Sequence, residues 1–176
     1  KARNRLHKEV DPVLLQEPEF RARHAEFRTK IALAIELVEE AIRCKVPFGV
    51  VVFDAWYLAE ELVQVLARRR KDWISVLKTN RLLETASFHL RDANGWPLKL
   101  PSPHIAVEKL VPLIPAQAYR CLTVAEHTYW CFTLRVRIPD LGKVRIVVSF
   151  ETEQLTGRSV VLVANRVDWS AAKIIG

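Results

Sequence analysis

Asp54 is the acidic side chain whose position in the sequence best suits catalysis. It directly follows residues 48–53, a continuous apolar run that predicts a strand buried on both faces of a sheet. The carboxyl end of such a strand is where α/β sheets present their ligands, and Mg²⁺ prefers carboxylate oxygens. Aspartate also caps helices, and an apolar period starting near Tyr57 predicts a helix just beyond. Asp54 is therefore either a metal ligand or a helix cap.

Four basic residues on two successive strand-like runs form a second candidate cluster: Arg135, Arg137, Lys143 and Arg145. Apolar residues alternate with them, and the Pro-Asp-Leu-Gly sequence at residues 139–142 predicts a hairpin between the runs. Pairing that keeps the apolar side chains on one face places all four cations on the other. Like charges that face each other are unfavourable. This face is therefore either simply solvated or bound to the phosphate backbone of a nucleic acid.

The first half of the chain alternates between helix and strand. Residues 1–27 show no clear period and are expected to form a surface segment. Apolar residues recurring every three or four positions predict a helix over residues 28–45. After the strand that ends before Asp54, the pattern predicts a second helix over 57–70 and a strand over 73–77. This order predicts an α/β unit with parallel strands.

Residues 81–165 have a different character, with turn signals and prolines followed by strand-like runs. The runs cover residues 120–126, 129–138, 143–150 and 159–164. Short strands that follow one another without intervening helices usually pair antiparallel. We therefore expect a largely antiparallel β insertion after the α/β unit.

Two segments of the chain resemble a known family. In the first segment, an apolar strand ends in Asp54, which Tyr57 closely follows. The next strand carries Lys78 and Asn80 at its end. This arrangement resembles the region around the second catalytic aspartate of insertion-sequence DDE transposases. In the second segment, residues 162–171 are similar to the part of that family which leads into the helix with the catalytic glutamate.

The resemblance implies part of an RNase H-like core over residues 28–80, a β insertion over 81–165, and the start of the catalytic-glutamate helix over 166–176. In that family two aspartates and one glutamate hold two divalent metal ions, Mg²⁺ or Mn²⁺. The metals activate the attacking oxygen and stabilise the leaving oxygen during DNA cleavage and strand transfer. Asp54 corresponds to one of these catalytic metal ligands, and Lys78 is placed to contact a DNA phosphate.

Two of the three acids have no counterpart here. The resemblance places the first aspartate upstream of Lys1 and the glutamate after Gly176, while Asp11 has no strand-like setting. The chain also contains no methionine, which an internal fragment of a longer protein would explain. One carboxylate does not position two metals against a phosphate. We therefore expect the fragment to be inactive by itself and to bind Mg²⁺ or Mn²⁺ weakly.

The composition is that of a globular and mildly basic protein. Hydrophobic residues make up 50% and charged residues 27%, which excludes a disordered chain, and no apolar run approaches the roughly 20 residues of a membrane span. Cys44, Cys121 and Cys131 are odd in number and are expected to be small core residues of a reduced, cytoplasmic bacterial protein. The net charge of +7 favours DNA as a partner. Transposases of this kind commonly act as homodimers.

Three functions stay open at this point. The first is a fragment of a DNA transposase, and the second is a non-catalytic remnant that binds DNA or a partner through the same basic insertion. The third is an unrelated α/β enzyme in which Asp54 is only a helix cap. The basic run at residues 68–71 is expected to be a solvated helix end, and the five histidines show no metal-site spacing. Three tryptophans either pack in the core or stack on an unpaired base: Trp96, Trp130 and Trp169.

Overall fold

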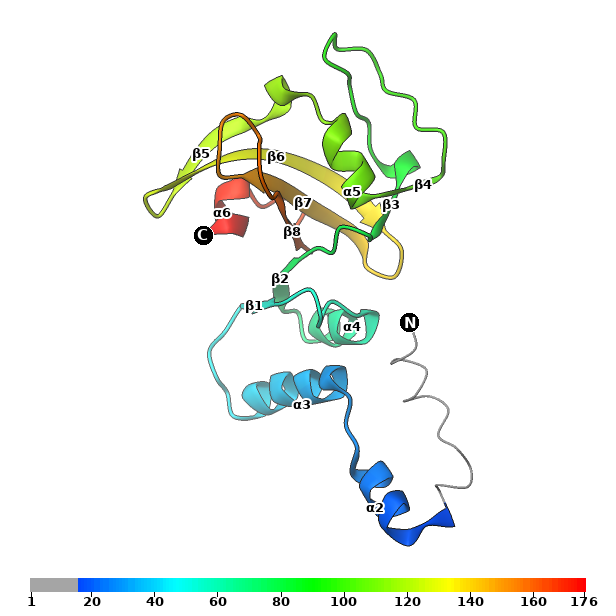
Figure 1. The fold of residues 1–176 in the computed structure, drawn as a ribbon. Helices are drawn as coiled ribbons and strands as arrows, with labels where there is room; N and C mark the ends of the chain where they lie inside the picture. The colour runs from blue at the N-terminus through cyan, green and yellow to red at the C-terminus, as the bar shows by residue number, and fades with distance from the viewer. Residues whose placement is uncertain (1–15) are drawn as a thin grey trace.

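The computed structural model describes residues 16–176, a mixed α/β fold around one six-stranded sheet (Figure 1). Its strands, in spatial order, are β1 Val50–Phe53, β2 Asp72–Val76, β8 Val160–Ala164, β7 Gly142–Phe150, β6 His127–Ile138 and β5 Arg120–Val124. The helices are α2 Pro18–Glu26, α3 Lys30–Arg43, α4 Glu60–Arg68, α5 Val107–Leu110 and α6 Ala171–Ile175. A two-stranded sheet and three short 3₁₀ helices complete the fold: β3 Leu82–Glu84, β4 His104–Ala106, η2 Thr85–Ser87, η3 Val111–Leu113 and η4 Ala116–Ala118. Within residues 16–176, no helix is long and apolar enough to cross a membrane.

Helix α3 forms where the apolar period predicts one. The hydroxyl of Thr29 caps it by accepting a hydrogen bond of 3.1 Å from the amide of Ala32. On its outer side, Glu39 accepts from Arg69 at the end of α4, with Nε 3.0 Å from Oε1, which joins the two helices. Its apolar stripe packs against the core: Ile31, Ala34, Ile35 and Val38.

Strands β1 and β2 are parallel and are connected by α4, as the sequence predicts. Their register pairs Phe53 with Ser75, so the two strands end at the same edge of the sheet. Helix α4 begins at Glu60 instead of residue 57, because the preceding backbone forms a turn in which Tyr57 N–H donates to Asp54 O at 2.9 Å. The buried face of α4 consists of Leu62, Val63, Val65 and Leu66.

The strands of the predicted insertion belong to the same six-stranded sheet as β1 and β2. Strand β8 pairs antiparallel with β2, and β7, β6 and β5 follow as antiparallel neighbours. The β6–β7 hairpin closes over residues 139–142, where Asp140 and Gly142 have φ angles of 69° and 77°. The prediction of largely antiparallel strands is confirmed. These strands also share one sheet with the α/β unit, which the sequence patterns do not predict.

The expectation that residues 48–53 form a central strand buried on both faces is wrong. Among the described strands, β1 pairs only with β2 and lies at the edge of the sheet. Val50 and Val52 are 38% and 73% exposed, whereas Val51 and Phe53 pack against the core. Figure 1 shows α3 and α4 together on one side of β1, which leaves its other face uncovered by them. A run of valines favours a strand but does not specify its neighbours.

The two faces of the sheet carry separate hydrophobic clusters. The larger cluster is covered by α4 and α5, with α3 packed around it; its most buried members include Leu66, Trp73, Leu83, Val107 and Ile146. The smaller cluster lies on the opposite face, where the segment around α6 covers it: Ile74, Cys131, Val147, Ala164, Trp169 and Ile174. The C-terminal segment is thus fixed to the sheet by burial of Trp169 and Ile174, which are 6% and 3% exposed.

The three cysteines differ in environment. Cys131 is buried, as expected of a small core residue, and burial raises the pKa of its thiol to about 11. Cys44 and Cys121 are exposed, so the expectation is wrong for these two. All three are free thiols.

Candidate active site

Asp54 lies directly after β1 with its side chain exposed. One carboxylate oxygen, Oδ1, accepts a hydrogen bond of 2.8 Å from the amide of Trp56. Helix α4 begins later, and its N-cap residue, Ala59, makes no side-chain capping bond. Asp54 is therefore not a helix cap, and the reading of it as only a cap is wrong. Among the described side chains and backbone amides, no donor bonds to its second oxygen, Oδ2, and the residue is exposed.

Two lysines from distant parts of the sequence meet at Trp56. The ammonium nitrogen of Lys78 lies 4.1 Å from the centroid of the Trp56 ring, and that of Lys30 lies 4.4 Å from it. Lys30 is the first residue of α3, and Lys78 follows β2 at the edge where Asp54 follows β1. Lys78 therefore lies beside the turn of Asp54, as expected. Trp56 and Lys30 are not predicted from the sequence, because neither the helix period nor the strand pattern indicates this convergence.

The register of the β6–β7 hairpin places the four predicted basic residues on one face. Arg135 pairs with Arg145, and Arg137 pairs with Lys143. Lys143 is exposed, and Arg137 is exposed with its Nε 3.7 Å from the carboxylate of Glu84. The expectation that the four cations share one face of the hairpin is therefore confirmed, although the four side chains have different surroundings.

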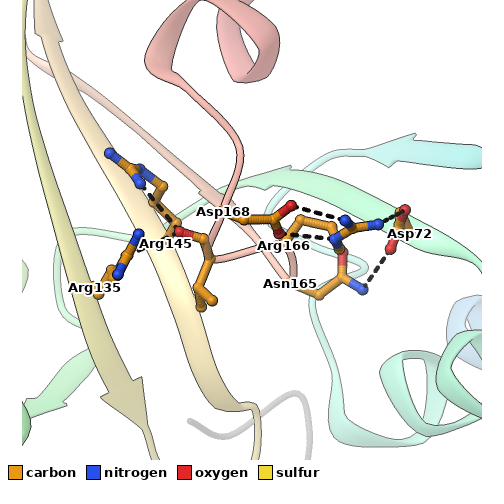
Figure 2. Close-up of polar contacts among 7 residues, drawn as sticks. Asp72, Arg135, Arg145, Asn165, Arg166 and Asp168 are labelled. Carbon is orange, nitrogen blue, oxygen red and sulfur yellow. Dashed lines mark hydrogen bonds and ion pairs between the residues drawn. The ribbon is translucent and has the colours of Figure 1, made fainter.

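Arg145 is a structural residue of the hairpin. Its Nη1 donates to the carbonyl of Val167 at 3.0 Å (Figure 2). Its Nη2 donates to the hydroxyl of Thr133 at 3.0 Å. Arg135 donates to the same Val167 carbonyl at 3.1 Å. Burial and then the nearby charge of Arg135 lower the pKa of the Arg145 guanidinium. Arg145 therefore binds the segment before α6. The exposed cations of this face are Arg135, Arg137 and Lys143.

A charged network joins the end of β8 to the start of β2 (Figure 2). Arg166 forms a bidentate pair with Asp168 at 2.9 and 2.8 Å, and its Nη1 donates to Asp72 at 3.2 Å. Asn165 donates to Asp72 at 3.2 Å and accepts from the amide of Trp73 at 2.9 Å. The Arg166 hydrogen bonds hold the pKa of Asp168 at about 2. The network fixes the backbone that leads into α6.

Asp168 does not cap α6. Ser170 is the N-cap, and its hydroxyl accepts from the amide of Lys173 at 3.3 Å. Asp168 is instead drawn to Arg166, because a bidentate pair uses both carboxylate oxygens.

The remaining candidates are divided between surface and interior. Of the basic run expected in solvent, Arg69 pairs with Glu39, and Lys71 donates to the carbonyl of Phe48 at 2.6 Å. Among the tryptophans, Trp169 is buried and Trp130 is partly buried against the core, which confirms core packing for them. Trp96 is 71% exposed.

Among the side chains that the structure describes, those of residues 16–22 and 27–176, no group of three or more His, Cys, Asp or Glu could hold a metal ion. Asp54 supplies a single carboxylate, with one oxygen already engaged by the Trp56 amide. Two divalent metals bound to a phosphate need several converging oxygens. The described residues alone therefore do not fit the metal pair that the resemblance implies, and no step through a metal follows from them.

Comparison with known families gives a match over more than half of the chain. A family model described as DDE superfamily endonuclease matches residues 8–109. The matched region includes Asp54, Trp56 and Lys78, and it ends before β5. No curated protein matches the chain.

Proposed function

The chain belongs to the DDE superfamily endonuclease family, and we propose that it is part of a DNA transposase whose Asp54 is one of three catalytic carboxylates. The observation that carries the proposal is the position of Asp54. It is an exposed carboxylate at the carboxyl end of a parallel strand, with one oxygen free of any described donor. The family match includes this residue. An RNase H-like core and a homodimeric full-length protein belong to the same proposal.

The role of Asp54 in this proposal is to bind a divalent metal, Mg²⁺ or Mn²⁺. Such a metal supplies charge stabilisation at the attacking and leaving oxygens of a phosphodiester. The Trp56 amide fixes the carboxylate at a single orientation through its 2.8 Å hydrogen bond. One carboxylate retains a metal only weakly, so the 176-residue chain is expected to be inactive in DNA cleavage by itself.

The proposed DNA contacts come from the two parts of the fold that carry exposed cations. Lys78 lies beside Asp54, and Arg135, Arg137 and Lys143 lie on the outer face of the β6–β7 hairpin. Arg145 supports this face through its bonds to Val167 and Thr133. Lysine and arginine contacts to phosphates give affinity that is independent of base sequence and falls with salt.

Paramagnetic Mn²⁺ tests the assignment of Asp54. We expect Mn²⁺ to broaden the NMR signals of residues around Asp54, and Asp54→Asn to abolish this broadening. Asp92 is a matched control, because its Oδ1 also accepts backbone amides, those of Asn94 and Trp96, at 2.9 and 2.8 Å. Broadening of equal strength around Asp92 would mean that any such turn attracts Mn²⁺ and would remove the support for Asp54 as a ligand.

A cleavage assay tests the rest of the proposal. The purified chain is expected to leave supercoiled plasmid intact in Mg²⁺ or Mn²⁺. Nicking that depends on metal and disappears in Asp54→Asn would contradict the expectation that the chain is inactive alone.

The second candidate function is a non-catalytic DNA-binding remnant. It is favoured by the basic hairpin, together with the lack of a three-residue metal group among the described side chains. DNA binding through Arg137 and Lys143, combined with no Mn²⁺ effect at Asp54, would select this function over the first.

A further inference from the structure

We infer that Lys30, Trp56 and Lys78 form a phosphate clamp that binds a DNA backbone phosphate beside Asp54, with Trp56 as the residue that positions both lysines. This inference rests on the proposed function and specifies how the same site holds its substrate. It concerns Lys30 and Trp56, which belong to neither the predicted metal site nor the basic hairpin.

The geometry of the three side chains is the first observation. Both ammonium nitrogens lie within 4.4 Å of the centroid of one ring, so they are less than twice 4.4 Å apart. Lys30 also lies 5.9 Å from the ring of Tyr57, and the two rings together fix its side chain. One phosphate can accept a charge-assisted hydrogen bond of about 2.8 Å from each lysine through a different oxygen.

The charges of the clamp are uncompensated. Among the side chains of residues 16–22 and 27–176, no carboxylate forms an ion pair with Lys30 or Lys78. Two like charges that converge on one ring repel each other, and the electrons of an indole ring offset only part of that cost at an exposed site. An anion held between the lysines would remove the repulsion.

The side chain of Trp56 is exposed, while its backbone amide is fixed by a hydrogen bond. Trp56 is 65% exposed, although its amide is fixed by Asp54 Oδ1 at 2.8 Å. The exposed indole ring is therefore accessible to the ammonium groups of both lysines. Because the same hydrogen bond orients Asp54 and Trp56, a phosphate in the clamp lies next to the carboxylate that is proposed to hold the metal.

Trp56 is expected to act on DNA through the two lysines beside it and not by stacking on a base. The clamp therefore binds the backbone, and its affinity does not depend on base identity.

A salt titration of DNA binding tests the clamp. Affinity of the 176-residue chain for a duplex oligonucleotide of arbitrary sequence is measured at several salt concentrations for the parent, Lys30→Ala, Lys78→Ala and Trp56→Ala. Each lysine variant is expected to bind roughly tenfold more weakly and to reduce the slope of log affinity against log salt by about 0.9. Trp56→Ala is expected to weaken binding by about two- to fivefold with a nearly unchanged slope, since both charges remain.

A double-mutant cycle separates positioning from stacking. In a chain that lacks both lysines, Trp56→Ala is expected to have no further effect, because Trp56 acts through them. A further loss would show that the ring contacts DNA directly and would overturn the positioning role. Matched controls are Trp96→Ala, which removes an indole of similar exposure at 71%, and Lys99→Ala, which removes an exposed lysine. Circular dichroism confirms that each variant is folded.

The outcomes distinguish this inference from the proposed function. A parent chain without salt-dependent DNA binding would remove both. A parent that binds DNA and loses affinity in Lys143→Ala, while the three clamp variants bind as the parent does, would overturn the clamp alone.

Discussion

Asp72 and Arg166 are 94 positions apart in the sequence and form an ion pair across the junction of β2 and β8, with Asp72 Oδ2 3.2 Å from Arg166 Nη1. Asn165 reinforces this junction by bonding both to Asp72 and to the amide of Trp73. The start of β2 is thereby joined to the segment that leads into α6. Strand β2 is also the partner of β1, so the junction relates the C-terminal segment to the strand pair that carries Asp54.

The Arg166 network is expected to make stability depend on pH in the acid range. Arg166 holds the pKa of Asp168 at about 2, below its ordinary 3.8. A carboxyl whose pKa is lowered by folding contributes stability that is present above the unfolded pKa and is lost as pH falls through the folded pKa. The difference in thermal unfolding midpoint between the parent and Arg166→Ala should therefore be complete above about pH 4 and disappear towards about pH 2. A difference that stays constant over this range would contradict the assignment.

Arg145 and Lys143 are expected to separate stability from DNA binding. Arg145→Ala removes the bonds to Val167 and Thr133 and should lower the free energy of unfolding by about 1–3 kcal/mol, measured in urea. Lys143→Ala removes an exposed cation and should change stability by less than about 0.5 kcal/mol while it weakens DNA binding. Equal losses of stability in both variants would show that Arg145 is no more structural than its exposed neighbour.

The two faces of β1 are expected to respond differently to truncation. Phe53 packs against the core with its ring centroid 5.8 Å from that of Trp73, so Phe53→Ala should destabilise the fold by about 2–4 kcal/mol. Val52 is 73% exposed, and Val52→Ala should cost less than about 0.5 kcal/mol. Urea denaturation measures both values. A large cost at Val52 would indicate that its face is covered in solution.

The free thiols are expected to react in an order set by burial and pKa. Burial raises the pKa of Cys131 to about 11, so little of the reactive thiolate forms near neutral pH. Cys121 is exposed and should be alkylated first by iodoacetamide, as followed by mass spectrometry. Cys44 should react more slowly than Cys121, because the hydrogen bond to Glu40 raises the pKa of its thiol. Early modification of Cys131 in the folded chain would contradict its place in the core.

Local patterns in the sequence determined the elements and the faces on which their residues lie. Helix α3, the order β1–α4–β2, the hairpin at residues 139–142 and the common face of Arg135 and Arg145 follow from periods of 3.6 and 2 residues and from turn composition. The position of Asp54 after β1 follows from the same patterns. Each depends on residues that are close together in the chain.

Only the tertiary structure decided which of these elements are neighbours. It placed β1 at the edge of the sheet, paired β2 with β8, paired Asp168 with Arg166, and brought Lys30 and Lys78 to Trp56. These relationships link residues far apart in the sequence, where no period connects one position to another. They are set by the burial of side chains from several elements at once, which a local pattern does not record.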